Sequence, residues 1–279
     1  MKKRIVTIAL VVALLATCFA GTYAYLTDTD EAINTMTLGN VDIEQYEWQR
    51  EVGEDGKYVT ATVDGKPSYV LEAYEQDKPL YPIVGDPNEP SDSPAYAGWD
   101  TTTVRMSQVY SYGGMQVFAG KNAQDKFVTV ANTGKTDAYV RTLVAIEVGT
   151  ADAAKIPVSH HNTWTKNIVG TVEIGGHNYY VLEFVYAGGQ LSDGTWRHEN
   201  GVLPAKDTTY PNLCQVYLKH NATNEDMVKI DANENGKLDI LVLSQAVQAA
   251  GFENAKLALD TAFGAVTAAT AAEWLANIQ

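Results

Sequence analysis

Short runs in which apolar and polar residues alternate, separated by turns rich in Gly and Asn, recur along this chain of 279 residues. In residues 137–148, Val140 and Val144 fall on one side of an extended chain, whereas Arg141 and Glu147 fall on the other. A period of two residues is typical of a strand with one buried face. The pattern therefore predicts a sheet that needs a second layer to cover its apolar side.

Turn sequences suggest how several of these strands are connected. The run 127–131 is followed by NTGK at 132–135, so we expect it to form a hairpin with 137–148. A Gly-Gly pair at 175–176 predicts a second hairpin, between 168–174 and 178–186. Further strands are expected at 36–44, which would open the mature domain, at 213–219, at 237–247, and at 58–63 and 68–73, which form an exposed hairpin around 64–67.

The C-terminal region changes from strand to helix patterning. Asn254 can cap a helix that runs to Phe263 and stops at Gly264. Thr270 and Glu273 have the spacing of a capping box for a last short helix. Together the patterns predict a mainly β fold, a jelly-roll or Ig-like β-sandwich with a loop-rich insertion and short C-terminal helices.

The N-terminus has the organisation of a cleavable signal peptide. Three basic residues at 2–4 precede an apolar run at 5–16, which is shorter than the roughly 20 apolar residues that a membrane span needs. Small residues at the first and third positions before a cut place cleavage between Ala24 and Tyr25. We therefore expect residues 1–24 to be the signal and the mature chain to be secreted, with no membrane attachment after cleavage.

The mature chain, residues 25–279, is expected to be a single domain. Residues 85–94 (GDPNEPSDSP) are typical of a surface loop. The surrounding segment, 45–114, is interpreted as an insertion on the sandwich.

The charge balance and the absence of catalytic motifs exclude several function classes. The formal net charge is −14, and the basic cluster lies inside the signal, which argues against a nucleic-acid partner. The sequence has no nucleophile elbow, no P-loop and no dinucleotide-binding glycine motif. A glycosidase carboxylate pair needs no local motif. The leading interpretation is a protein that is not an enzyme and has no cofactor.

One loop imitates a calcium site. Its first, third, fifth and ninth positions carry oxygen ligands, in the order Asp231, Asn233, Asn235 and Asp239. The twelfth position, where such loops have a bidentate Glu, is Val242. The Asn-Gly pair at 235–236 equally favours a simple turn. A weak calcium site and a turn are both compatible with this pattern.

The remaining chemistry-bearing residues favour structural roles. The pair His160–His161 lacks the spacing of a zinc hydrolase, and exposed loops are the expected place for the histidines. Cys214 alternates with Val216 and Leu218, which predicts a buried structural thiol.

Four segments resemble proteins of Firmicutes that are exported through the signal peptidase SipW, with the TasA/camelysin family as the nearest named group. They are GTYAYLTDTD at 21–30, TMTLGNVDI at 35–43, VANTG with DAYVR at 130–141, and AVQAAGF at 246–252. The resemblance implies a jelly-roll sandwich, a cell-surface or biofilm-matrix location and, in some members, fibres. In those members the mature N-terminal segment pairs as a strand with the next subunit. Here that segment is 25–42, with Thr37, Leu38, Val41 and Ile43 as donor-strand candidates.

The sequence analysis thus leads to one principal hypothesis and two alternatives. The first is a structural protein of a Gram-positive surface or matrix that associates with itself or with other matrix proteins. The second is a surface module that binds carbohydrate or protein through aromatic residues of the insertion, such as Tyr96 and Trp99. The third is a secreted hydrolase or metalloprotease.

Overall fold

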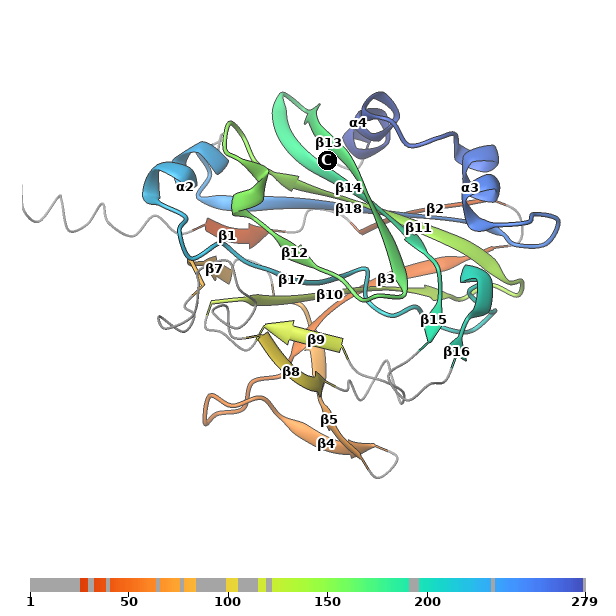
Figure 1. The fold of residues 1–279 in the computed structure, drawn as a ribbon, viewed down its shortest axis with the longest axis horizontal. Coiled ribbons are helices and arrows are strands. Elements are labelled where there is room, and N and C mark those ends of the chain that lie inside the picture. Colours follow the sequence, from red (N-terminus) through yellow and green to blue (C-terminus); the bar gives the residue numbers. More distant parts are fainter. Residues whose placement is uncertain are drawn as a thin grey trace, which may run out of the picture.

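The computed structural model describes residues 26–29, 33–38, 41–63, 66–75, 78–83, 99–104, 115–118, 122–190, 196–231 and 234–277. Two sheets stack face to face, and short helices lie at the periphery (Figure 1). The expected mainly β sandwich is confirmed. The cleavage residues Ala24 and Tyr25, and Tyr96 of the insertion, lie outside the described residues.

The first sheet contains the longest strands. Its order along the sheet is β13 (Trp164–Ile174), β14 (His177–Tyr186), β11 (Ala138–Glu147), β18 (Lys237–Gln248), β1 (Leu26–Thr29) and β7 (Lys78–Leu80), and β2 (Ile33–Leu38) also pairs with β18. Strand β11 lies antiparallel to both β14 and β18. Strands β1 and β2 run parallel to β18. The described N-terminal strands therefore attach to the sheet through its most C-terminal strand.

The second sheet is shorter, and small two-stranded ribbons accompany it. Its order is β12 (Val158–Ser159), β17 (Leu213–Val216), β10 (Gln124–Asn132), β3 (Ile43–Arg50) and β6 (Leu71–Ala73). The ribbons pair β4 (Thr60–Val63) with β5 (Lys66–Tyr69), β8 (Trp99–Val104) with β9 (Met115–Phe118), and β15 (Gly189–Gln190) with β16 (Trp196–Arg197). Because β3 reaches Arg50, the second sheet includes the first residues of the segment 45–114.

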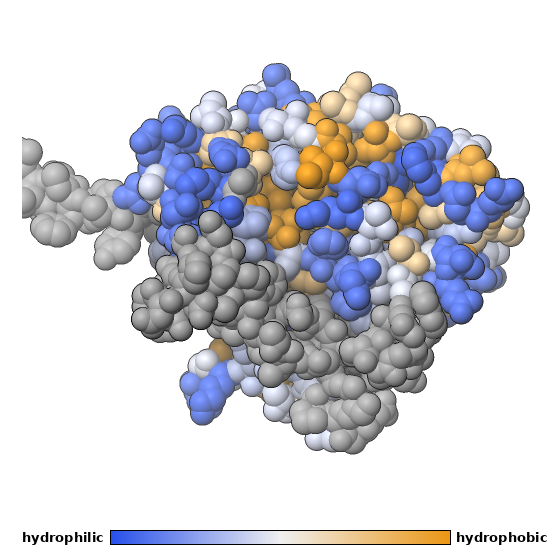
Figure 2. Space-filling model, in the orientation of Figure 1, coloured by the Kyte–Doolittle hydropathy of each residue, from blue (hydrophilic) through white to orange (hydrophobic). Residues whose placement is uncertain are grey.

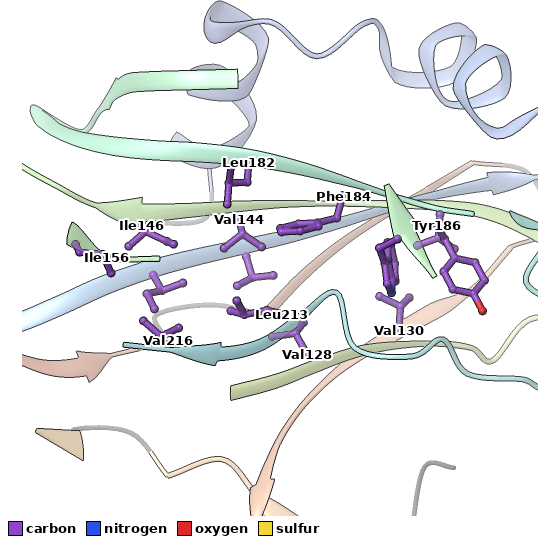
Figure 3. Packing of buried hydrophobic residues seen from close by; sticks show 14 of the residues in the cluster. Val128, Val130, Val144, Ile146, Ile156, Leu182, Phe184, Tyr186, Leu213 and Val216 are labelled. Carbon is purple, nitrogen blue, oxygen red and sulfur yellow. The ribbon is translucent and has the colours of Figure 1, made fainter. Parts of the chain in front are cut away.

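The main core fills the space between the sheets. In Figure 3, Val128 and Leu213 of the second sheet face Val144 of the first, and each of these side chains is fully buried. Burial of this apolar surface is the main force that holds the layers together.

Two helices cover the outer face of the first sheet. Helix α4 (Ala268–Ala276) packs on an apolar cluster that includes Leu143 and Leu243, and α3 (Ala255–Phe263) packs near Tyr139 and Val247. Strand β11 is consequently buried on both faces, so the prediction of a half-buried strand was wrong. Its outward charged residues, Arg141 and Glu147, are 0% exposed.

The strands at 127–131 and 137–148 do not form the expected hairpin. Strand β10 pairs with β3 and β17, whereas β11 belongs to the first sheet. The turn between them carries the chain from one sheet to the other. Asn132 stabilises this corner, because its side chain donates to the carbonyl oxygen of Thr136 and accepts from the N–H of Gly134.

Of the other predictions from the sequence, some are confirmed and others are wrong. The hairpin β13–β14, strand β18 and helix α3 with its Asn254 cap are confirmed. The exposed hairpin expected from 58–63 and 68–73 is confirmed only in part, because β4 pairs with β5 at 66–69, whereas residues 71–73 form β6 in the second sheet and Leu71 is buried. The single strand expected at 36–44 is instead the end of β2 and the start of β3. The capping box of α4 is formed by Thr267 and Thr270, one turn earlier than predicted. Three short helices were not predicted: α2 (Asn224–Ile230), η1 (Ala153–Lys155) and η2 (Glu199–Gly201).

Candidate functional site

The N-terminal strands lie beside the central strand β18 and form the first candidate site. Residues 33–38 of β2 pair in parallel register with residues 242–247, so that Thr37 lies opposite Ala246 and Leu38 opposite Val247. Residues 27–29 of β1 pair with residues 237–239. One side of β18 is therefore completed by β11, and the other by strands from the N-terminal end of the described chain.

The other two donor-strand candidates lie in a different part of the sandwich. Val41 and Ile43 are buried in the main core, with exposed fractions of 5% and 3%. Ile43 opens β3, opposite Asn132 of β10. The candidates therefore divide into two groups: Thr37 and Leu38 belong to β2, and Val41 and Ile43 belong to the packed core.

Hydrogen bonds within the predicted calcium loop occupy the carboxylate of its first residue, Asp231. Asp231 caps α2, and its two carboxylate oxygens accept from the N–H groups of Asn235 (3.0 Å) and Gly236 (2.9 Å). The side chain of Asn235 also lies 3.5 Å from a carboxylate oxygen of Asp239. Asn233 lies outside the described residues. Within the described parts of the chain, no three His, Cys, Asp or Glu residues gather as a metal-binding group.

The histidines are not all exposed, contrary to the expectation. His161 is 6% exposed and stacks on Tyr210, with 4.2 Å between the ring centroids. Its Nδ1 lies 2.9 Å from the hydroxyl of Thr163. The prediction failed because two loops that are far apart in sequence meet here. Cys214 is buried as predicted, and burial raises the pKa of its thiol.

A hydrogen-bonded relay that the sequence did not suggest links β14 to the following loops. The hydroxyl of Tyr186 lies 2.6 Å from Nδ1 of His198, and Nε2 of His198 lies 2.8 Å from a carboxylate oxygen of Asp207. Arg197 donates to the second oxygen of Asp207 at 2.7 Å. No local motif could reveal this arrangement, because its members are spaced without a regular period.

The pKa shifts and the burial of these residues indicate that the relay stabilises the fold. Burial lowers the pKa of His198 and raises the pKa of Tyr186. Burial alone would raise the pKa of Asp207, but hydrogen bonds from His198 and the N–H of Thr208 bring it below its ordinary value. The order Tyr–His–Asp has the connectivity of a catalytic relay. However, Tyr186 is 0% exposed, so its hydroxyl cannot meet a substrate.

Two buried ion pairs join β3 to β10 in the second sheet. Arg50 donates two hydrogen bonds to Asp125, at 2.6 and 2.9 Å, and its guanidinium lies 3.8 Å from the ring centroid of Tyr58. Lys126 reaches Glu47 at 2.6 Å in a buried position. Among these contacts, the one between Arg50 and Tyr58 links the residues after β3 to the second sheet. Trp99, a candidate aromatic residue, opens β8.

The comparisons with known proteins add no neighbour to this description. None of the helices in the described part of the chain is long and apolar enough to cross a membrane. No family model, curated protein or solved structure matches the chain.

Proposed function

We propose that this protein is a secreted structural component of a bacterial cell surface or biofilm matrix, and that copies join by exchanging an N-terminal strand. The donor segment is residues 26–38, which form β1 and β2. The placement of β2 beside β18 is the observation that carries this proposal. The signal-peptide pattern and the resemblance to exported matrix proteins support the location.

The donor segment has the geometry of an exchangeable element. Among the strands that the structure describes, β2 is hydrogen-bonded to β18 alone. Only residues 39–42 separate it from β3 in the opposite sheet. A short link next to an exchangeable segment favours exchange between copies. The first part of the donor segment, β1, also pairs antiparallel with β7, so the segment of a neighbouring copy has to replace this contact as well as the ladder with β18.

Strand exchange preserves the contacts of the acceptor. When β2 leaves, the backbone N–H and C=O groups of β18 at 242–247 lose their partners along that edge. The same segment of a neighbouring copy restores the same ladder, as in other complexes formed by strand addition. Because the contacts in the two states are equivalent, protein concentration decides which state is populated.

The direction of exchange determines the shape of the assembly. Each copy gives one donor segment and accepts one, through two different surfaces. Such a head-to-tail contact produces an open filament unless its rotation closes a ring. A filament fits a matrix protein, because every added copy presents a new acceptor edge.

Electron microscopy of negatively stained protein tests the proposal. A chain that begins at Tyr25 is incubated at increasing concentration beside a chain that begins at Gly39, which keeps the buried residues Val41 and Ile43. We expect filaments only from the longer chain. A synthetic peptide of residues 26–38, added in excess, should shorten the filaments because it occupies the acceptor edge.

Circular dichroism of the shorter chain with the peptide distinguishes loss of folding from loss of assembly. If the peptide restores a cooperative thermal transition and filaments still do not form, the donor segment is required for assembly. Filaments of the same appearance from the shorter chain would refute the proposal. A longer chain that stays monomeric at every concentration would refute it equally.

A further inference from the structure

A pocket opens at the side of the sandwich where the two sheets separate. It has a volume of about 350 Å³, and its lining includes Asp152, Ile156, Val158, Lys166 and Leu182. Its walls come from η1 and β12 on one side and from β13 and β14 on the other. Figure 2 shows apolar surface in the middle of this face, with hydrophilic residues around it.

The pocket exists because each sheet ends here. Strand β13 is the last strand of the first sheet and β12 is the last strand of the second, in the order formed by the described strands. In Figure 3, Leu182 of β14 and Ile156 point into the margin of the main core, so the pocket floor is continuous with that core. The size and the apolar lining agree with small-molecule sites, which range from about 300 to 1,000 Å³.

The outer wall carries exposed apolar surface as well as a cation. Lys166 lies opposite Phe184 and Ile168 lies opposite Leu182 in the β13–β14 ladder, so both side chains are on the core-facing side of the sheet. Ile168 is 66% exposed. A β-bulge follows it, between Ile168 and Gly170, which bends the strand at the edge of the pocket.

The charges at the pocket favour an anionic ligand group. Lys166 makes no ion pair with any residue that the structure describes, although the chain has a formal net charge of −14. His160 packs 5.4 Å from the ring centroid of Phe184, and its pKa is lowered by burial and by the charge of Lys166. The pocket therefore has the ammonium group of Lys166 on its wall and apolar side chains on its floor. Asp152, which directly precedes η1, also lines the pocket and would repel an anion placed close to it.

We propose that this pocket binds a small aliphatic carboxylate, with the hydrocarbon chain against Ile156, Val158 and Leu182 and the carboxylate at the ammonium of Lys166. The apolar chain removes the exposed pocket walls from water, which supplies most of the affinity. The ion pair orients the ligand and selects its charge. None of these residues belongs to the donor segment, so this proposal and the assembly proposal can fail independently.

Isothermal titration calorimetry of the chain that begins at Tyr25 tests the site, with decanoate as the probe below its micelle-forming concentration. Decan-1-ol and decylammonium are probes of the same chain length with neutral and positive head groups. We expect saturable binding of one decanoate per chain, weaker binding of decan-1-ol and none of decylammonium. Replacing Lys166→Met should weaken decanoate binding about tenfold, because one ion pair is lost.

Two variants separate the site from non-specific uptake. Lys135→Met removes an exposed charge from the turn between β10 and β11, which does not line the pocket. This variant should bind decanoate as the parent protein does. Val158→Trp fills the pocket and should abolish binding while the thermal transition remains cooperative. The proposal is overturned if decanoate does not saturate a single site. It is also overturned if Lys166→Met and Lys135→Met bind equally well, or if decylammonium binds as tightly as decanoate.

Discussion

Replacing Arg141→Met tests how the C-terminal helices are held to the first sheet. The side chain of Arg141 is 0% exposed and bridges three elements. Its Nε donates to Gln245 of β18 at 2.7 Å, and its Nη2 donates to the carbonyl oxygen of Gly264 at 2.9 Å. Its Nη1 lies 3.1 Å from the carboxylate of Asp260 in α3. Methionine keeps much of the apolar volume and removes all of these bonds.

The magnitude follows from the burial of the partners. Removing one partner of a buried ion pair costs about 3–5 kcal/mol, because the other partner is left uncompensated. Asp260 keeps 24% of its side chain exposed and retains its ion pair with Lys256, and Glu183, 3.6 Å from Nη1 of Arg141, is 15% exposed. Both carboxylates can be rehydrated, which places the estimate near the lower limit. We therefore expect Arg141→Met to lower the free energy of unfolding by about 3 kcal/mol. For a chain of this size that corresponds to a decrease of about 6–12 °C in Tm.

Urea denaturation followed by circular dichroism measures this loss. The matched control is Lys229→Met, which removes an exposed i,i+4 ion pair with Glu225 and should leave the midpoint unchanged within error. The double variant Arg141→Met, Asp260→Leu should recover part of the stability, since the carboxylate of Asp260 is removed together with its partner and only that of Glu183 remains. If Arg141→Met shifts the midpoint no more than Lys229→Met does, the reasoning is refuted.

Three further predictions concern His198 of the relay, the close approach of the backbone at Gly188, and the buried thiol of Cys214. Folding lowers the pKa of His198 below its ordinary value of about 6.5, so its contribution to stability is complete above that pH and is lost as the pH falls. The urea midpoint of the parent protein should therefore decrease as the pH is lowered from 7.5 to 5. The midpoint of His198→Gln should decrease less over the same range. Gly188→Ala should destabilise far more than Gly176→Ala, although both glycines have positive φ. A Cβ at Gly188 would lie 1.8 Å from the carbonyl oxygen of His198, whereas Gly176 faces open space. Equal thermal shifts would contradict this. Cys214 should react with a thiol reagent only in denaturant, and rapid reaction of the folded chain would contradict its burial.

Local patterns in the sequence were sufficient to locate most strands but not to identify all their partners. The Gly-Gly turn at 175–176 predicts β13 and β14 as a pair because the signal is confined to neighbouring residues. The turn at 132–135 has similar composition and nevertheless connects two different sheets. Alternation shows that a strand has two different faces, but it carries no information on which strand lies beside it. That choice depends on packing between residues far apart in the chain.

The buried charged residues were even harder to predict, because their partners are also far away in the sequence. Arg141 was expected on an exposed face, because charged residues are seldom buried without a partner. Its partners Gln245 and Asp260 lie more than a hundred residues away, with separations of 104 and 119 residues. The relay from Tyr186 through His198 to Asp207 was missed for a related reason, since each residue alone has the composition of an ordinary loop or strand.

The candidate assembly strand was only partly predictable. The resemblance at 35–43 predicts a donor strand in this region, and the structure divides these residues between β2 and the buried start of β3. The alternation of 36–44 does not show this division. The break appears only when the opposite sheets are in place, because the chain must cross from one to the other within residues 39–42.

Disulfide trapping across β2 and β18 tests strand exchange most directly. Thr37 lies opposite Ala246, and adjacent strands are about 4.8 Å apart, within the range that a disulfide can bridge. The variant Thr37→Cys, Ala246→Cys is made in a Cys214→Ala background, allowed to assemble, oxidised, and separated in denaturant without reductant. The control pair, Glu173→Cys and Asn178→Cys, lies within the β13–β14 hairpin and must give monomers. The account predicts a ladder of covalently linked multimers for the first pair. Filaments that yield only monomers would show that each β2 stays on its own chain, and would contradict the account.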